Sequence, residues 1–203
     1  MTIGGSSGLT TTEPADGQLS DDELMRRIGN ADRQAFTALV GRHLARAVGT
    51  ARRLLGSQFD AEEVAQEAFT RVWTHASDWR PSGSGGAQFT TWLYRIVVNL
   101  CIDRRRRPGF ESIDAIPEPV DATPDAVSNL QDEAVSAQVN AALSELPDRQ
   151  REALTLCFYE GLSNGEAAEI LSLSVGAIES LLVRARRTLR ERLQTTFKEL
   201  VEG

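Results

Sequence analysis

The sequence predicts an all-α protein. Ala, Leu, Arg and Glu dominate its 203 residues, and aromatic residues make up only 6% of them. No stretch alternates polar and apolar residues as a half-buried strand would, whereas apolar residues recur at helical spacing. With 41% hydrophobic residues, the chain is long enough for one large domain or two small helical domains with their own cores.

The first 18 residues are expected to be a disordered lead-in. They lack the basic start and apolar centre of a secretory signal, and no apolar run in the chain reaches 18 residues, so we expect no membrane insertion. Cys101 and Cys157 each lie in an apolar helical pattern. Buried, reduced thiols in a cytoplasmic protein are favoured over a disulfide or a redox pair.

Residues 19–107 form the first predicted domain. Ser20 and Glu23 fit a capping box ahead of the periodic segment 24–56, and Asp60 and Glu63 fit a second one ahead of residues 61–76. The loop "WRPSGSGGAQ" follows at 79–88. It does not fit a phosphate-binding P-loop, because no G-K-[ST] follows it and no strand precedes it.

A helix is predicted over residues 89–107, with two distinct faces. Its inward stripe comprises Leu93, Ile96, Val97 and Leu100. Trp92, Arg95 and Asn99 share another face, where an indole can stack on a base, a guanidinium can bind phosphate and an amide can contact a base edge. The alternative, given equal weight from this helix alone, is a core Trp92 with solvated polar neighbours.

The same helix ends in a run of four arginines. The helix macrodipole stabilises cations at a helix C-terminus, and a run of arginines also fits a nuclear localisation-like patch. The macrodipole accounts for one or two cations more readily than for four, so we expect phosphate contacts by the arginines of the run, namely Arg104, Arg105, Arg106 and Arg107.

An acidic segment separates this domain from a second one at 129–203. Residues 108–148 contain no Lys or Arg and nine carboxylates, although the whole chain carries a net charge of only −7. Four prolines argue against a helix in the first part, so residues 108–128 are predicted to be a flexible acidic linker. Helical spacing returns through its later apolar positions, which are Leu130, Val135, Val139, Ala142 and Leu146.

The second domain contains a helix-turn-helix pattern. Ser163 and Glu166 form a capping box for a short helix, "SLS" makes a turn, and Ser174 caps a longer helix from 175 to about 193. The inward face of the long helix is predicted at Val175, Ile178, Leu182, Ala185 and Leu189. Its outer stripe would enter the DNA major groove, with phosphates contacted by flanking arginines. The predicted DNA-contacting residues are Ser174, Gly176, Glu179, Ser180, Val183, Arg184 and Arg187.

Three stretches resemble the successive regions of an extracytoplasmic-function (ECF) sigma factor of the sigma-70 family. They are "DAEEVAQEAFTRVW", "FTTWLYRIVVNLCIDRRRR" and "LPDRQREALTLCFYEGLSNGEAAEILSLSVGAIESLLVRARRTLRE". The resemblance runs from about residue 19 to 193 in the family's order. It differs where many relatives carry Gly in place of Ser172, and where they carry basic or polar residues in place of Glu179, Leu181 and Val183.

The resemblance implies specific partners. RNA polymerase would dock through the β′ clamp helices and the β flap, the former on Asp60, Glu63, Gln66, Glu67, Phe69 and Trp73. The helix with Trp92, Arg95 and Asn99 would read the −10 element, and the helix-turn-helix would read the −35 element. An anti-sigma factor would hold the chain inactive, at the inner membrane if that factor is membrane-bound. No cofactor is implied.

Two other classes of protein stay open from the residues alone. One is a regulator that binds operators by itself, and the other is a helical module that binds only proteins. An enzyme is not expected, because His43 and His75 are isolated and no nucleophile has a base beside it. No cluster with metal-ligand spacing occurs either.

Overall fold

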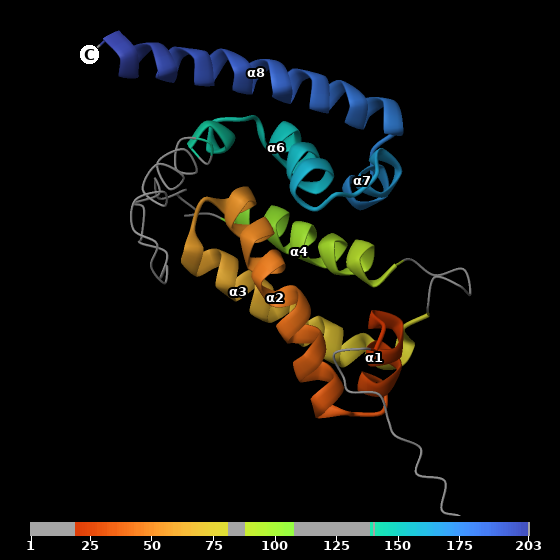
Figure 1. The fold of residues 1–203 in the computed structure, drawn as a ribbon. Helices are drawn as coiled ribbons and strands as arrows, with labels where there is room; N and C mark the ends of the chain where they lie inside the picture. The colour runs from red at the N-terminus through yellow and green to blue at the C-terminus, as the bar shows by residue number, and fades with distance from the viewer. Residues whose placement is uncertain (1–18, 81–87, 108–138, 140, 203) are drawn as a thin grey trace, which may run out of the picture.

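The described residues form two groups of helices that lie against each other, one from the N-terminal half of the chain and one from the C-terminal half (Figure 1). A computed structural model describes residues 19–80, 88–107, 139 and 141–202, and within these ranges it contains helices and no strand. The prediction of an all-α fold with two helical domains is confirmed. The expected disordered N-terminus at 1–18 and the whole predicted acidic linker at 108–128 lie outside the described residues.

The described residues of the N-terminal domain form four α-helices and one short 3-10 turn. They are α1 (Asp21–Ile28), α2 (Arg33–Leu55), α3 (Gln58–His75), η2 (Ala76–Asp78) and α4 (Phe89–Arg105). Where one long segment was expected after residue 24, the chain turns at residues 29–32 and begins again with Asp32 as a new cap, which accepts from the backbone of Gln34 and Ala35. Gly56, with φ 74°, ends α2 in the left-handed conformation that suits glycine.

The predicted capping signals are confirmed in part at α1 and are wrong at α3. Ser20 caps α1 and accepts from the backbone N–H of Glu23, while the Glu23 carboxylate pairs with Arg26 and so does not complete a capping box. The predicted capping box at Asp60 and Glu63 is wrong. Ser57 is the cap of α3, because α2 ends only at Gly56 and Ser57 is the first residue with a capping side chain after it.

Within its described residues, the C-terminal domain has helical residues 141–144, which are followed by four further elements. These are α6 (Asp148–Leu154), the π-helical turn η4 (Thr155–Tyr159), α7 (Asn164–Leu171) and α8 (Val175–Glu202). The capping box of Ser163 and Glu166 is present with both of its hydrogen bonds, as the spacing predicted. Helix α8 extends past the predicted end near residue 193.

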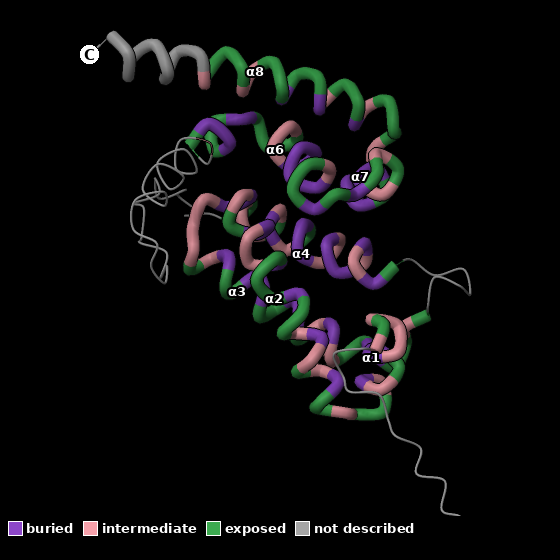
Figure 2. The backbone as a smooth tube through the Cα atoms, viewed as in Figure 1, coloured by how far each residue is buried: buried purple, intermediate pink, exposed green. Residues whose placement is uncertain are grey.

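Helix α4 lies in the middle of the molecule. It packs against α2 and α3 on one side and against α7 on the other, while α6 and α7 separate it from α8 (Figure 1). Buried residues therefore occur on both sides of α4 (Figure 2). Of its predicted inward stripe, Leu93 and Val97 are buried and Ile96 and Leu100 are half-buried. The two predicted domains thus contact each other directly.

Candidate functional site

The helix-turn-helix is formed by α7, the residues 172–174 and α8. Ser172 adopts the left-handed conformation (φ 54°, ψ 47°), which turns the chain between the two helices. The Ser174 hydroxyl accepts from the backbone N–H of Ala177, as expected of a cap. Ile178, Leu182 and Ala185 are buried against α6 and α7. Val175 was predicted to face inward, but it is 45% exposed because it occupies the first turn, beyond the edge of the packed helices.

The outer face of α8 is open to solvent. Figure 2 shows exposed residues along the side of α8 that points away from the rest of the molecule. The predicted DNA-contacting residues of this helix-turn-helix are all exposed, and Val183, an apolar side chain, is 66% exposed. Arg187 lies 3.9 Å from Glu191, and the Arg186 guanidinium stacks over the Phe158 ring at 5.1 Å. An exposed apolar side chain among arginines suits contact with a thymine methyl group flanked by phosphates.

The predicted single-strand face of α4 is only partly exposed. Asn99 is exposed, and the Arg95 side chain is 42% exposed and lies 3.5 Å from Glu169 of α7. Trp92 was predicted on the same exposed stripe, yet it is half-buried in an aromatic cluster with Trp79 and Phe89, at centroid distances of 5.3 and 6.1 Å. The cluster takes Trp92 inward because burying an aromatic surface is worth more than leaving it in water.

The four arginines at the end of α4 have different surroundings. Arg104 hydrogen-bonds Asp60 and pairs with Glu63 on α3. Burial lowers the pKa of Arg104, but the hydrogen bonds that its guanidinium donates to these carboxylates, together with their charges, outweigh it and the net pKa is raised. Arg105 pairs with Asp148 at 3.0 Å and with Glu152, both in α6. The remaining two, Arg106 and Arg107, are exposed.

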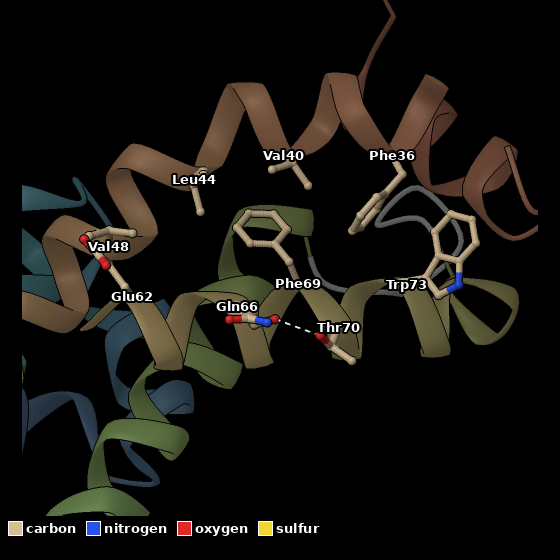
Figure 3. Close-up of a pocket in the computed structure, with 9 residues that line it drawn as sticks. All are labelled: Phe36, Val40, Leu44, Val48, Glu62, Gln66, Phe69, Thr70 and Trp73. Carbon is tan, nitrogen blue, oxygen red and sulfur yellow. Dashed lines mark hydrogen bonds between the residues drawn. The ribbon is translucent and has the colours of Figure 1, made fainter. Parts of the chain in front are cut away.

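An apolar groove runs between α2 and α3 (Figure 3). We call it the α2–α3 groove, and it is lined by Phe36, Val40, Leu44, Val48, Glu62, Gln66, Phe69, Thr70 and Trp73. Of the residues predicted to dock polymerase, Gln66, Phe69 and Trp73 line it. Glu67 is exposed and bonds Arg71 instead, while Asp60 and Glu63 lie toward α4.

Sequence reasoning missed the α2 wall of this groove. Phe36, Val40, Leu44 and Val48 follow each other at four-residue intervals, and they form a second apolar row beside the buried one that contains Leu39 and Ala47. That spacing is a readable signal for a second contact face. The Phe36 and Trp73 rings meet edge to face at 5.1 Å and close one end of the groove.

The described residues offer no site for a metal ion. Within them, no three His, Cys, Asp or Glu side chains come together as ligands would, and no helix is long and apolar enough to cross a membrane. Both cysteines are free thiols, with Cys101 buried and Cys157 half-buried.

Comparison with known proteins shows the family of this chain. The family model described as "Sigma-70 region 2" matches residues 39–110, and the one described as "Sigma-70, region 4" matches residues 136–189. The ECF RNA polymerase sigma-E factor of Escherichia coli is 31% identical over 89% of this chain and 98% of its own length. The chain belongs to the ECF sigma factors of the sigma-70 family.

Other relatives agree with this assignment. The ECF RNA polymerase sigma factor SigE of Mycolicibacterium smegmatis is 37% identical over 83% of this chain, although the chain spans only 65% of that longer relative. CnrH, solved in complex with the cytosolic domain of CnrY, has a TM-score of 0.64 and 28% identity, covering 86% of this chain and 97% of its own. The sigma factor RpoE of Bartonella quintana, solved with the anti-sigma factor NepR, has a TM-score of 0.60 and 27% identity, covering 78% and 96%.

This sigma factor therefore acts with bacterial RNA polymerase in promoter-specific transcription initiation, and it is not itself an enzyme. The region 2 match contains α3, α4 and their predicted docking and −10 residues, and the region 4 match contains the helix-turn-helix. Both functional regions of the family are present on one chain.

Proposed function

We propose that each exposed surface of this sigma factor has one task in initiation. The α2–α3 groove and the carboxylates of α3 dock core polymerase, the Asn99 face of α4 with its arginines reads the −10 element, and the outer face of α8 reads the −35 element. The observation that carries the proposal is the helix-turn-helix, whose second helix leaves its predicted base-contacting stripe exposed from Gly176 to Arg187.

The proposed work of α4 follows from its chemistry. A melted −10 strand exposes base edges, and an exposed amide such as Asn99 can both donate to and accept from them. Arg106 and Arg107, at the end of the same helix, are exposed and cationic, so they are available for the phosphates of that strand. At the start of α4, the rings of Phe89 and Trp92 pack against Trp79, which fixes this end of the helix.

Run-off transcription with purified bacterial core polymerase tests this assignment. The template is the promoter upstream of the chain's own gene. We expect initiation from one defined start, and a loss of about 5- to 150-fold of the product with Asn99→Ala, since a bidentate contact between an amide and a base edge is worth about 1–3 kcal/mol. Asn30→Ala, an exposed asparagine in the same domain and away from α4, is the matched control and should transcribe as the wild type does.

The outcome also separates the rival classes of protein. Core binding that survives Asn99→Ala while transcription is lost would support base reading by α4. Failure to bind core polymerase would exclude the proposed docking surface. Binding of duplex DNA at physiological salt without polymerase would instead favour a regulator that acts alone, and activity that survives the loss of both Asn99 and Arg187 would favour a module that binds only proteins.

The domain limits and the inhibitor belong to the same proposal. The working domains are residues 19–107 and 129–203, joined by an acidic linker at 108–128, and the chain acts in the cytoplasm. An anti-sigma factor holds it inactive, and the solved pair of RpoE with NepR, which shares its fold, supports this. A partner isolated with the chain must stop run-off transcription when it is added to the purified mixture, and one that does not is not the inhibitor.

A further inference from the structure

Glu179 is an anionic side chain on the outer face of α8, the face proposed to contact DNA. The exposed arginines of this helix, among them Arg184 and Arg187, suit DNA phosphates, whereas phosphates repel a carboxylate. Glu179 is exposed, and no hydrogen bond or ion pair joins it to another of the described residues. Its place on a surface for a polyanion therefore requires a physical reason.

Helix α8 gives Glu179 no cation to pair with. Side chains three and four positions apart are neighbours on a helix, and Glu191 has Arg187 at that spacing, with 3.9 Å between their charged groups. The four neighbours of Glu179 at that spacing are all uncharged, namely Val175, Gly176, Leu182 and Val183. A solvated salt bridge along the helix, which is the ordinary role of an exposed glutamate, is therefore not available to Glu179.

The surroundings of Glu179 along the helix are apolar. Val175 is 45% exposed and Val183 is 66% exposed, and they precede and follow Glu179 by four residues in one row. A Cβ atom at Gly176 would contact none of the described residues, so glycine leaves room there for a partner close to the helix backbone. A surface that covers this row removes water from the carboxylate, which is costly unless that surface supplies a hydrogen-bond donor.

The major groove of DNA offers two kinds of donor. They are the N4 amino group of cytosine and the N6 amino group of adenine, whereas guanine and thymine present acceptors in this groove. The N6 amino group of adenine lies beside the N7 acceptor of the same base, which repels the second carboxylate oxygen. Cytosine presents its amino group without an acceptor of its own beside it, so it is the base that best accommodates a carboxylate.

We propose that Glu179 determines the specificity of the −35 interface by selecting a cytosine. Its carboxylate accepts from the N4 amino group, and it rejects guanine and thymine because their acceptors would face an anion. Val183 lies about 6 Å further along α8, so a thymine methyl group in contact with it belongs to a base pair about one or two steps away. The assignment rests on the proposed reading of the −35 element by α8.

The serines of the same face are less suited to this role. The Ser174 hydroxyl accepts from the backbone N–H of Ala177 at 3.2 Å, and the Ser180 hydroxyl donates to the backbone carbonyl of Gly176 at 2.9 Å. Both hydroxyls are thus already used within the helix. Of these three side chains, Glu179 is the one whose hydrogen-bonding capacity is wholly available to a base.

Run-off transcription by the holoenzyme tests the assignment on the promoter upstream of the chain's own gene. Every base pair of the −35 region is replaced in turn by the other base pairs, and product is measured below saturation with polymerase. The wild type is compared with Glu179→Gln and with the control Glu191→Gln. Both variants exchange a carboxylate of α8 for an amide of the same shape, but Glu191 has Arg187 beside it and lies about three turns further along the helix.

The expected result is a change of preference at one base pair. Replacing one cytosine should cost the wild type about 5- to 150-fold of its product, the range of a specific contact to a base edge. In Glu179→Gln the preference at that base pair, and at no other, should pass to adenine, because glutamine pairs with both N6 and N7 of adenine. Glu191→Gln should keep the wild-type preference at every base pair.

A second variant controls for the charge. Glu179→Asp keeps the carboxylate on a side chain that is shorter by one methylene group, so it should still prefer cytosine, by a smaller factor. If Glu179→Gln does not fold in a thermal unfolding measurement, this variant decides the question. A preference for another base in Glu179→Asp would overturn the assignment, because the carboxylate would then not be the selecting group.

Failure of the assignment and failure of the proposed function give different results. If Glu179→Gln changes the product of all promoters by the same factor, Glu179 acts only through its charge and the assignment falls. It also falls if the wild-type profile depends on sequence but not on a cytosine that residue 179 controls. A wild-type holoenzyme that responds to no replacement in the −35 region, or that does not initiate, would instead overturn the proposed reading by α8.

Discussion

Ser172 shows how much one residue contributes to the geometry of the helix-turn-helix. Its φ of 54° lies in the left-handed region, where a Cβ atom crowds the backbone and glycine has no such penalty. This conformation is the physical reason why glycine, which many relatives of the resembled family carry in place of Ser172, suits the position. A serine tolerates the turn at a cost, whereas a β-branched residue would be strained further.

Substitution at Ser172 should therefore change stability in both directions. We expect Ser172→Gly to raise the free energy of unfolding by about 0.5–1 kcal/mol and Ser172→Val to lower it by about 1–2 kcal/mol. Chemical denaturation of the full chain measures both values. If Ser172→Gly lowers the free energy of unfolding instead, the added conformational entropy of the unfolded chain outweighs the backbone strain that glycine removes from the turn.

The two thiols should differ in reactivity. Burial raises the pKa of the Cys101 thiol to about 12, with Arg105 lowering it and the charge of Glu152 adding to the rise. The thiolate is the reactive species, so Cys101 should stay unmodified by an aromatic disulfide reagent at pH 8 in the folded chain, whereas the half-buried Cys157 reacts more readily. Peptide mapping after a timed reaction distinguishes them. Faster labelling of Cys101 would contradict its burial.

Among the elements, α7 depends on its capping box. The hydrogen bonds from the side chain and backbone of Ser163 lower the pKa of Glu166 against the effect of burial, and the Thr91 hydroxyl adds a bond at 3.0 Å. Because the pKa in the folded state is below the usual 4.5, the ionised carboxylate stabilises the fold above about pH 4.5, and that stabilisation is lost as the pH falls through the lowered value.

A pH series of unfolding measurements checks this sign. From about pH 6 to pH 3 the wild type should lose more stability than Glu166→Gln, because the glutamine has no ionised form to lose. At pH 6 the variant should be less stable by about 1 kcal/mol. Parallel pH profiles for the two proteins would show that the ionised cap contributes nothing.

The α2–α3 groove allows a direct test of polymerase docking. Leu44 is 39% exposed at the rim, so Leu44→Asp leaves the core intact and places a charge on an apolar contact surface. We expect at least about a tenfold loss of affinity for core polymerase, measured by surface plasmon resonance. Ala45→Asp, at an exposed position of the same helix outside the groove, is the control. Equal losses for both variants would exclude the groove as the docking surface.

Sequence reasoning succeeded for elements with local signals. Ser20, Ser163 and Ser174 were recognised as caps because a cap depends only on residues three or four positions away. Asp60 was misread, since a cap also depends on where the preceding helix ends. The burial of Trp92 and Arg105 could not be predicted, for a different reason. Whether they face solvent depends on Trp79 and Glu152, which come from other parts of the chain, and no local pattern records that.

At the scale of the whole molecule, the chain must change shape to reach a promoter. Elements near −10 and −35 lie about 25 base pairs apart, which is about 80 Å at 3.4 Å per pair, whereas the two domains contact each other here. The 21 residues of the predicted linker could span up to about 70 Å if fully extended. Together with the domains themselves, this length is sufficient for both elements to be reached at once.

Charge and closure should keep the free chain off DNA. With a net charge of −7, the chain lacks the overall attraction that drives non-specific binding. We expect its affinity for a promoter duplex at 150 mM salt, about physiological strength, to be at least about 100-fold lower alone than as holoenzyme. Anisotropy titrations with and without core polymerase measure the ratio. A ratio near one would contradict this, because DNA binding would then need no polymerase.

Arg104 connects the proposed polymerase-docking surface with the proposed DNA-binding surface. Its guanidinium is shared by Asp60 and Glu63, residues assigned to the polymerase, while it belongs to the arginine run assigned to the promoter. Any ligand that engages those two carboxylates must compete with Arg104, and any anion that engages Arg104 leaves them without their counter-ion. Such competition is thermodynamic linkage, and linkage is reciprocal. The two binding equilibria consequently share one coupling free energy, so the factor by which polymerase changes the affinity for DNA equals the factor by which DNA changes the affinity for polymerase.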